Sequence, residues 1–358
     1  MTRYIFNKIF YGILTLLGVA TIVFLLFSVL PGDPARMMLD QKEDPEQLAQ
    51  IRKNLGLDQP IWKQYLYYLN DLSPVSIHKN QGENYTSLST GKYDGLQIFK
   101  GKENSVLLKY PYLRTSFQRQ GKTVTDIISE TLPNTIVLAV SAISLAILIG
   151  ISLGIWAALV KDSWIDRTLL VITSFGMSTP SFFSAIIIAY IFGFLLHHYT
   201  GLPMTGSLYE IDDMGENKNL MLRNLILPAL TLGIRPLAVI TQLTRNSLLE
   251  VLQQDYIRTA YAKGLKSRDV IWKHALKNSL NPVITATSGW FASMLAGAVF
   301  VEFIFGWNGL GKEIVNALNT LDLPVVMGAV LVIATVFIII NILVDILYGI
   351  LDPKVRLS

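Results

Sequence analysis

The chain has 358 residues, of which 51% are hydrophobic and 16% are charged, and its mean hydropathy is +0.44. A soluble globular domain carries about 25% charged residues, so this composition excludes an ordinary soluble protein and indicates one that crosses the bilayer. The formal net charge is +4, but the basic residues flank apolar segments, which favours membrane orientation over nucleic-acid binding, and a sequence without cysteine excludes disulfides and Cys-based metal sites.

Six apolar segments predict an all-α membrane protein with six transmembrane helices. The first lies at about residues 8–30 and follows Arg3 and Lys8, as the apolar part of a signal peptide would. Its apolar stretch of about 20 residues exceeds the roughly 7–15 of a cleavable segment, so we assign residues 1–30 to a retained first helix. The other segments lie at roughly 131–160, 168–198, 223–247, 281–304 and 324–351.

Basic residues in the short loops set the orientation of these helices. With six spans, all of these loops fall on one side of the membrane if both ends of the chain are cytoplasmic. The basic residues are Arg3, Lys8, Lys161, Arg167, Arg258, Lys263, Lys266, Arg268, Lys273, Lys277, Lys354 and Arg356. The loops on the other side are acidic or balanced, so hydropathy and charge predict the same topology.

The region between the first two segments, about residues 31–130, is too long to lack structure of its own. Asp44-Pro45-Glu46 supplies an N-cap, a proline in the first turn and an acid, and Gly56 supplies a stop, so these residues predict a helix. Asp58-Gln59-Pro60 predicts the start of a second, amphipathic helix. This external region therefore begins as two short helices.

Residues at about 73–112 differ from these helices because they are polar and rich in Gly, Asn and Ser. We interpret them as an insertion on the outer face, with a hairpin turn at Asp94-Gly95. The rest of the chain, residues 131–358, is predicted to form a five-helix core. This core includes a long cytoplasmic connection between its third and fourth helices.

That connection mixes polar and apolar residues, and its part at about 250–265 is compatible with a short helix. Ala260, Ala262 and Gly264 are small, so such a helix could dock closely against another protein, and Gly264 would end it in a left-handed conformation. An ordinary solvated basic loop held near anionic lipid fits the composition equally well. Composition alone leaves both interpretations open.

Two parts of the connection resemble a known family. They read Asp255-Tyr256-Ile257-Arg258-Thr259-Ala260-Tyr261-Ala262-Lys263-Gly264 and His274-Ala275-Leu276-Lys277-Asn278-Ser279-Leu280-Asn281-Pro282-Val283. The pattern resembles the cytoplasmic signature of binding-protein-dependent ABC import permeases, and more narrowly the dipeptide/oligopeptide/nickel permease family. Further matches, in the same order as in the family, are Leu30-Pro31-Gly32-Asp33-Pro34, Leu55-Gly56-Leu57-Asp58-Gln59-Pro60, Leu227-Pro228-Ala229-Leu230, Gly306-Trp307-Asn308-Gly309-Leu310-Gly311 and Leu351-Asp352-Pro353. The insertion and Asn308, where the family often has proline, are departures from the pattern.

The resemblance implies the B-type permease subunit of an ATP-driven peptide importer in the bacterial inner membrane, a protein that is not itself an enzyme. It implies a second homologous permease, two ATPase subunits that bind ATP and Mg, an external substrate-binding protein, and no cofactor on this chain. The signature segment would form a coupling helix that inserts into a groove on the ATPase and drives alternating access. The coupling residues implied in this way are Asp255, Tyr256, Arg258, Thr259, Ala260, Ala262, Lys263 and Gly264.

The segment from Gly306 to Glu313 has the G-x-x-x-x-G-K spacing of a phosphate-binding loop. Glu313 replaces the Ser or Thr that would coordinate Mg²⁺, no strand precedes the segment, and the topology places it outside the cell. We therefore predict a tight re-entrant turn that roofs the channel, and we expect ATP hydrolysis on another polypeptide.

Three residues are candidates for the translocation path. Arg235 lies near the midplane of the fourth segment, where a charge costs about 2.5–3.5 kcal/mol and should face protein or water. Either Arg235 borders the path and attracts an anionic group such as a peptide carboxylate, or it pairs with Glu302 or Asp345 inside the membrane. Pro180 should kink the third segment, which could line a cavity or serve packing alone. The path candidates are Arg235, Pro180 and Glu302.

Other classes of function fit less well. A self-contained channel or secondary transporter would place several ionisable groups at the midplane, and often shows inverted repeats that this sequence lacks. The four histidines and the remaining polar residues form neither a metal-binding pattern nor a catalytic set. Within the family, nickel or another small solute stays the alternative cargo to peptides.

Overall fold

The computed structural model describes residues 2–29, 34–37, 44–81, 85–212 and 217–351. The chain divides into two compact units, which we describe separately. The N-terminal unit comprises Ile5–Glu130 and Ile314–Thr335, and the core unit comprises Met1–Tyr4, Thr131–Glu313 and Val336–Ser358. The boundary at residue 130 coincides with the predicted start of the core, whereas the first helix belongs to the same unit as the external region. The motif residues at 30–33 and 352–353 lie outside the described residues.

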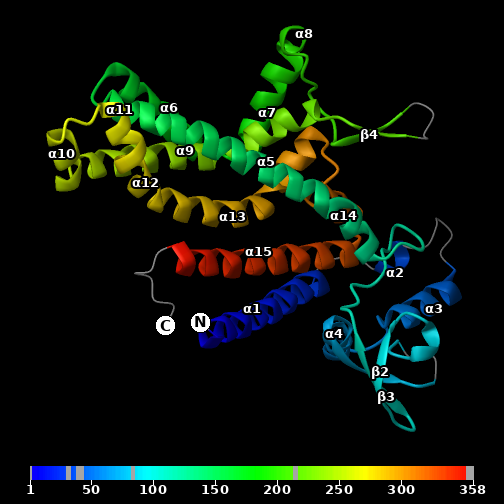
Figure 1. The fold of residues 1–358 in the computed structure, drawn as a ribbon. Coiled ribbons are helices and arrows are strands. Elements are labelled where there is room, and N and C mark those ends of the chain that lie inside the picture. The colour runs from blue at the N-terminus through cyan, green and yellow to red at the C-terminus, as the bar shows by residue number, and fades with distance from the viewer. Residues whose placement is uncertain (1, 30–33, 38–43, 82–84, 213–216, 352–358) are drawn as a thin grey trace. The chain divides into compact units, whose positions relative to one another are not determined.

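Five helices are long and apolar enough to span a membrane within the described residues (Figure 1). They are α1 (Thr2–Val29), α5 (Val124–Leu159), α9 (Arg223–Leu252), α13 (Asn281–Phe305) and α15 (Leu323–Leu351). Each agrees with a predicted span to within a few residues at one or both ends, and the mostly helical membrane fold is confirmed. The long apolar runs explain this agreement, because in lipid a helix satisfies every backbone polar group within its own segment.

The predicted third span at 168–198 is not one straight helix. It consists of α6 (Trp164–Ser178) and α7 (Ser181–Ile188), which continues as the π-helical η2 (Ala189–Leu195), and the two parts are bent by 111°. Pro180 lacks the N–H needed by the helix and disfavours the helical conformation at Thr179, which is extended with ψ 134°. The expected kink is therefore a full break, and the chain has six spans only if this bent pair is counted as one.

The core unit is built around close contacts between α5, α7, α9 and α13. The two glycines of the Gly150-x-x-x-Gly154 motif let α5 approach α9, as Figure 1 shows. A Cβ on Gly150 would lie 2.9 Å from the Ile240 side chain, and one on Gly154 would lie 2.7 Å from the Thr241 carbonyl. No larger residue fits at these positions without moving a helix.

Short elements connect the long helices of the core unit. They are α8 (His197–Thr200), β4 (Tyr209–Ile211), β5 (Lys218–Leu220), α10 (Asp255–Ala262), α11 (Ser267–Asp269), the π-helical η3 (Val270–Ala275), α12 (Leu276–Ser279) and the start of α14 (Leu310–Asn319). Strands β4 and β5 form a two-stranded antiparallel ribbon. The connection between α9 and α13 is thus mostly helical, as the family resemblance implied for its first part.

The N-terminal unit contains the two short helices predicted after the first span. The first is α3 (Pro45–Leu55), in which Asp44 accepts a hydrogen bond from the Glu46 N–H at 3.0 Å and Gly56 ends the helix with φ 71°. The second is α4 (Ile61–Leu72), which packs on α1 through stacked rings of Phe24 and Tyr68 at 5.6 Å. A short helix, α2 (Pro34–Met37), precedes both.

The insertion folds into a small sheet, which an all-α class did not anticipate. Its strands are β1 (Val75–Lys79), β2 (Gly95–Lys100) and β3 (Asn104–Lys109), in the antiparallel order β1-β3-β2, with the 3₁₀ turn η1 (Leu88–Thr90) between β1 and β2. The predicted hairpin turn at Asp94-Gly95 is wrong. Gly95 already pairs with Lys109, and the chain reverses at Gly101, whose N–H donates to the Asn104 carbonyl at 2.9 Å. A two-residue turn signal says nothing about where strand pairing begins, which the partner strand decides.

Candidate functional site

The predicted coupling segment forms α10, which is attached to the end of α9 by its inward face. Ile257 is fully buried and Ala260 is 6% exposed, and both belong to an apolar cluster with Leu248 of α9 and with Val270 and Ala275 of η3. The small side chain of Ala260 therefore allows close packing within this chain. Gly264 follows the helix with φ 81°, as predicted for a left-handed terminus.

The opposite face of α10 is open to solvent. Tyr256 and Tyr261 are 42% and 44% exposed, and Arg258 and Lys263 are exposed beside them. The Tyr256 hydroxyl accepts a hydrogen bond from Asn278 Nδ2 at 2.9 Å, which fixes its ring relative to α12. Asp255, Thr259 and Ala262 are exposed too, so every implied coupling residue except Ala260 lies on the open part of this segment.

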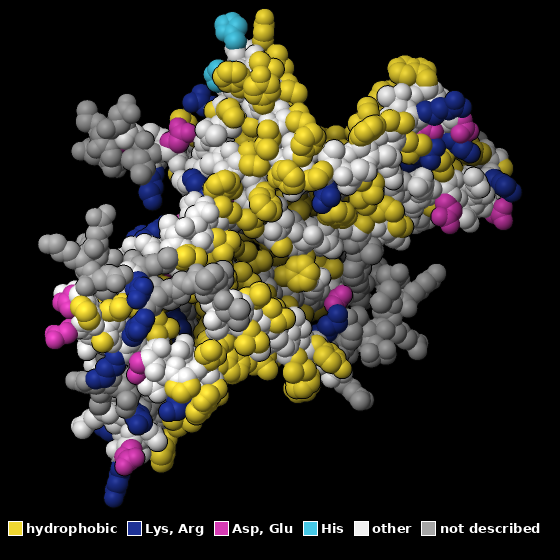
Figure 2. Space-filling view, turned by 180° about the vertical axis from the view of Figure 1, so that it is seen from behind, with side chains coloured by type: hydrophobic (Ala, Val, Ile, Leu, Met, Phe, Trp, Pro, Cys, Tyr) yellow, Lys and Arg dark blue, Asp and Glu magenta, His cyan; other side chains and the backbone are white. Residues whose placement is uncertain are grey.

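Charged side chains gather over the end of the core unit that carries α10–α12, whereas hydrophobic side chains cover its middle (Figure 2). The exposed basic residues there are Arg258, Lys263, Lys266, Arg268, Lys273 and Lys277. Trp272 is 58% exposed among them. This is the kind of surface that meets either another protein or the headgroup region of a bilayer.

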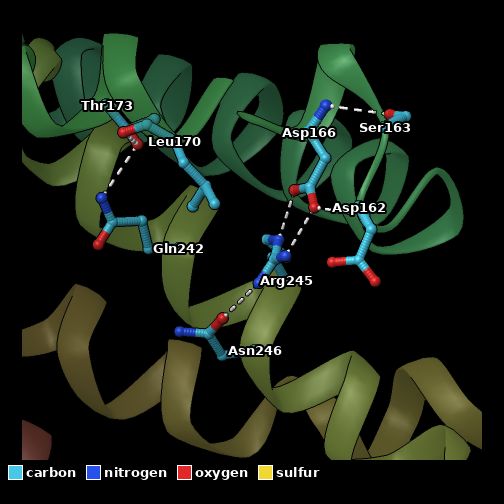
Figure 3. Close-up of polar contacts among 8 residues, drawn as sticks. All are labelled: Asp162, Ser163, Asp166, Leu170, Thr173, Gln242, Arg245 and Asn246. Atoms are coloured by element: carbon cyan, nitrogen blue, oxygen red, sulfur yellow. Dashed lines mark hydrogen bonds and ion pairs between the residues drawn. The ribbon is translucent and has the colours of Figure 1, made fainter. Parts of the chain in front are cut away.

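A buried ion pair that the sequence did not reveal holds α9 against the start of α6. Asp166 is 1% exposed and accepts two hydrogen bonds from the Arg245 guanidinium, from Nε at 2.6 Å and from Nη2 at 2.7 Å (Figure 3). The Asp162 N–H also donates to Asp166 at 3.0 Å, and Ser163 caps the helix through the Asp166 N–H. Because α10 follows α9 directly, this bidentate ion pair fixes the C-terminal part of α9, from which α10 extends.

A polar recess lies where the broken third span meets α9 and α13. It has a volume of about 70 Å³, and its lining combines Thr179, Ser181, Ser184, Thr231, Arg235, Trp290 and Ser293 with apolar residues. Water occupies about 30 Å³ per molecule in the liquid, so this open recess has space within this chain for a few waters and not for a peptide. Pro180 is flanked by two of the lining residues, and its break is what brings their hydroxyl groups to the recess.

Arg235 contributes the one charge among these lining residues. It is exposed although it lies in the middle of a span, and it forms no ion pair with any residue that the structure describes. A charge at this depth should face protein or water, and the recess provides that environment. The alternative in which Arg235 pairs with Glu302 or Asp345 is not found among the described residues.

Glu302 has a structural role instead and does not line the recess. Its side chain is fully buried, and its Oε2 accepts hydrogen bonds from the Gly311 N–H at 2.6 Å and the Lys312 N–H at 3.1 Å. A carboxylate is stabilised at the N-terminus of a helix, here α14, by these free N–H groups and by the helix dipole. Glu302 therefore lies apart from the recess that contains Arg235, and its place in the translocation path stays a prediction. The same contact occupies backbone N–H groups of the Gly-rich segment that a phosphate would need.

The turn between α13 and α14 is held by further contacts within the core unit. Trp307 is fully buried and donates from Nε1 to the Asn134 carbonyl at 3.1 Å. Asn308 donates its backbone N–H to Ser207 Oγ at 3.1 Å, and its side chain accepts from Lys312 Nζ at 2.8 Å. A proline here would have neither group, so the departure from the family pattern is matched by local contacts.

Replacement of Gly311 by alanine is expected to lower the free energy of unfolding by about 1–3 kcal/mol. A Cβ there would lie 2.5 Å from Val299 Cα and 2.8 Å from Glu302 Oε2. Gly289→Ala is the matched control in the preceding helix, because a Cβ at Gly289 meets nothing within 4 Å. Thermal unfolding of the purified variants measures the difference, and equal midpoints for both would contradict this account of the turn.

Comparison with known proteins agrees with the geometry. Residues 150–357 match the family described as binding-protein-dependent transport system inner membrane component, and residues 1–88 match the N-terminal family of these membrane components. The dipeptide transport system permease protein of Alkalihalophilus pseudofirmus is 34% identical to this chain, covering 99% of it and 100% of the relative. The corresponding protein of Escherichia coli and a di/tripeptide transport system permease protein of Pseudomonas aeruginosa are each 33% identical over 99% of both chains.

Among solved structures, a chain from inward-facing conformations of the MetNI methionine ABC transporter is similar in fold. The TM-score is 0.50 at 16% sequence identity, and the match covers 64% of this chain and 98% of that chain. At this identity the likeness concerns the fold alone.

Proposed function

The chain belongs to the family of inner membrane components of binding-protein-dependent transport systems, and on that premise we propose that it forms half of the translocation path of a di- and oligopeptide importer. It is a multi-pass permease subunit of the inner membrane, and ATP hydrolysis belongs to separate subunits. The observation that supports a half-path is the recess at Arg235, which is open on one side and too small for a peptide within this chain.

The proposed assembly contains a second homologous permease, two ATPase subunits that bind ATP and Mg, and an external substrate-binding protein. Both ends of this chain are proposed to be cytoplasmic, on the same side as α10. The open face of α10 fits a groove on an ATPase subunit, because it presents aromatic and basic side chains on a helix whose other face is fixed to α9. Movement of the ATPases would pass through α10 to α9 and would open the path to alternate sides.

Peptides are favoured as cargo by the relatives and by the charge at the recess. Relatives that cover the whole chain are named for dipeptide and di/tripeptide transport. An exposed guanidinium beside several hydroxyl groups suits a carboxylate, which every unmodified peptide carries, and it would repel a nickel cation. Arg235 is therefore the residue of this chain proposed to meet the peptide terminus.

A host that lacks this chain is expected to lose uptake of labelled di- and oligopeptides while keeping nickel uptake. Complementation with the wild-type chain should restore peptide uptake, and the complex purified from it should contain P-loop ATPase subunits. Restoration of nickel uptake alone would keep the architecture and overturn the peptide cargo. Full activity of the isolated chain without ATPases would overturn the importer.

Arg235→Gln is expected to reduce uptake of peptides with a free carboxylate by about tenfold or more, since a charge-assisted hydrogen bond contributes roughly 1.5–3 kcal/mol. Uptake of C-terminally amidated peptides should change little, because they lack the anionic group. Arg223→Gln, an exposed arginine at the start of the same helix, is the matched control. Equal loss with both kinds of peptide would remove the carboxylate contact from the mechanism.

A further inference from the structure

A second pocket lies within the N-terminal unit, between α3 and the sheet-bearing insertion. Its volume is about 340 Å³, within the roughly 300–1,000 Å³ of small-molecule sites. The lining residues are Asn54, Leu55, Leu57, Tyr85, Lys92, Tyr112, Arg114, Thr115 and Phe117. The pocket therefore combines two cations with three aromatic rings and two leucines.

Both cations lie against the same ring. Lys92 Nζ is 4.5 Å from the centroid of Tyr85, and Arg114 Cζ is 5.4 Å from it. Tyr85 is buried and its hydroxyl donates to Asp71 at 2.8 Å, so the position of this ring in the pocket lining is fixed. Two positive groups therefore lie beside one ring of the pocket lining.

The two charged residues among the described lining residues of this pocket, Lys92 and Arg114, are both cations. Asp71 is fully buried and pairs with Arg114 Nε at 2.9 Å, and its backbone carbonyl accepts from Lys109. Among the described residues, Asp71 is the only acid with an ion pair or hydrogen bond to Lys92, Lys109 or Arg114. Of these cations only Arg114 contacts the Asp71 carboxylate, which also accepts from the Tyr85 and Tyr93 hydroxyl groups, and Lys92 has no carboxylate partner among the described residues. Burial lowers the pKa of Lys92.

The terminal amino groups of the Arg114 guanidinium are available to donate hydrogen bonds to a ligand. Only its Nε is used by Asp71, its side chain is 20% exposed, and its terminal amino groups make no hydrogen bond to a described residue. Its backbone has φ 70°, a left-handed conformation that costs a residue other than glycine about 1–3 kcal/mol and is typical of ligand clamps. Lys92 donates to the Asn54 carbonyl at 3.0 Å, which leaves two of its three protons for a ligand.

We propose that this pocket binds a small organic carboxylate of about dipeptide size, with the carboxylate between Lys92 and Arg114 and the apolar part against Tyr112, Phe117 and the leucines of α3. The planar fork of an arginine suits a carboxylate, and aromatic walls suit an apolar body. The choice of a peptide as the ligand rests on the proposed function. The pocket is separate from the recess at Arg235, since all of its residues belong to the N-terminal unit.

The test uses the full-length chain in lipid nanodiscs with Arg235→Gln, so that the recess contributes no carboxylate contact. Isothermal titration with alanyl-phenylalanine is expected to show saturable binding, and the C-terminal amide should bind about tenfold more weakly or not at all. Lys92→Gln should weaken binding of the free acid about tenfold, whereas Lys100→Gln, an exposed cation on β2, should leave it unchanged. Lys92 is the variant of choice because Arg114 also balances buried Asp71.

Three outcomes would overturn the proposal. They are no saturable binding, equal affinities for the acid and the amide, and equal affinities of the Lys92 and Lys100 variants. If neither dipeptide form binds but Lys92→Gln loses association with an acidic external protein, the pocket is a protein contact and the ligand assignment is wrong. Peptide uptake by the assembled importer is measured separately, so the proposed function can hold when this assignment fails.

Discussion

Replacement of Arg245 by methionine is expected to lower the free energy of unfolding by about 3–5 kcal/mol, the usual cost when one partner of a buried ion pair is removed. Asp166 would then keep its charge at 1% exposure with the Asp162 N–H as the remaining hydrogen-bond donor to its carboxylate among the described residues. The effect should be the largest of any single charge removed in the core unit. Thermal unfolding of the purified chain in detergent measures it.

Two variants test the cause of this loss. The double variant Asp166→Asn with Arg245→Met removes the charge on both sides and should recover most of the lost stability, since replacing both partners of a buried pair is often neutral. Arg167→Met removes an exposed arginine next to Asp166 and should change stability by no more than about 0.5 kcal/mol. A double variant as unstable as the single one would show that packing, and not charge, is responsible.

Tyr261→Ala is expected to leave the fold intact and to weaken association with the ATPase subunits by about 30-fold, with a matching loss of ATP-driven uptake. The ring is 44% exposed on the open face of α10, and exposed aromatic anchors at interface centres commonly contribute about 2 kcal/mol or more. Co-purification with the ATPases and uptake by the complex are the two readouts. Tyr209→Ala is the matched control, since Tyr209 is similarly exposed at 47% and lies in β4.

Substitution on the inward face of α10 should instead lower the stability of the fold. Ile257→Ala creates a cavity in the cluster below the helix and should lower the free energy of unfolding by about 2–5 kcal/mol, because Ile257 is fully buried. Loss of stability in Tyr261→Ala, or normal ATPase association of this variant, would contradict a helix with one face packed on α9 and the other face bound to the ATPase.

The positions of most helices followed from local chemistry. Asp44 and Gly56 bound α3 because a capping carboxylate and a residue free to adopt positive φ satisfy the groups that a helix end exposes. Gly264 follows α10 for the same reason. The long apolar runs predicted the spans because lipid leaves a backbone no other way to satisfy its polar groups.

Predictions failed where a distant segment decides the outcome. The turn of the insertion lies at Gly101 and not at Asp94-Gly95, because pairing with β3 already includes Gly95. The sequence showed that Pro180 would interrupt a helix, but the 111° angle depends on how α6 and α7 each pack on α9. An apolar segment of about 30 residues could equally cross the membrane once or fold back.

The sequence by itself determined the class of the protein, its apolar segments, the family motifs and the short helix α10, because these depend on composition and on residues close together in the chain. Only the tertiary structure decided how charged residues are used. Asp166 and Arg245 meet although they lie 79 positions apart, Glu302 caps α14 and leaves Arg235 to the recess, and Lys92 and Arg114 share one ring. The partner of a charge is set by which helices and strands pack together, and no local pattern specifies it.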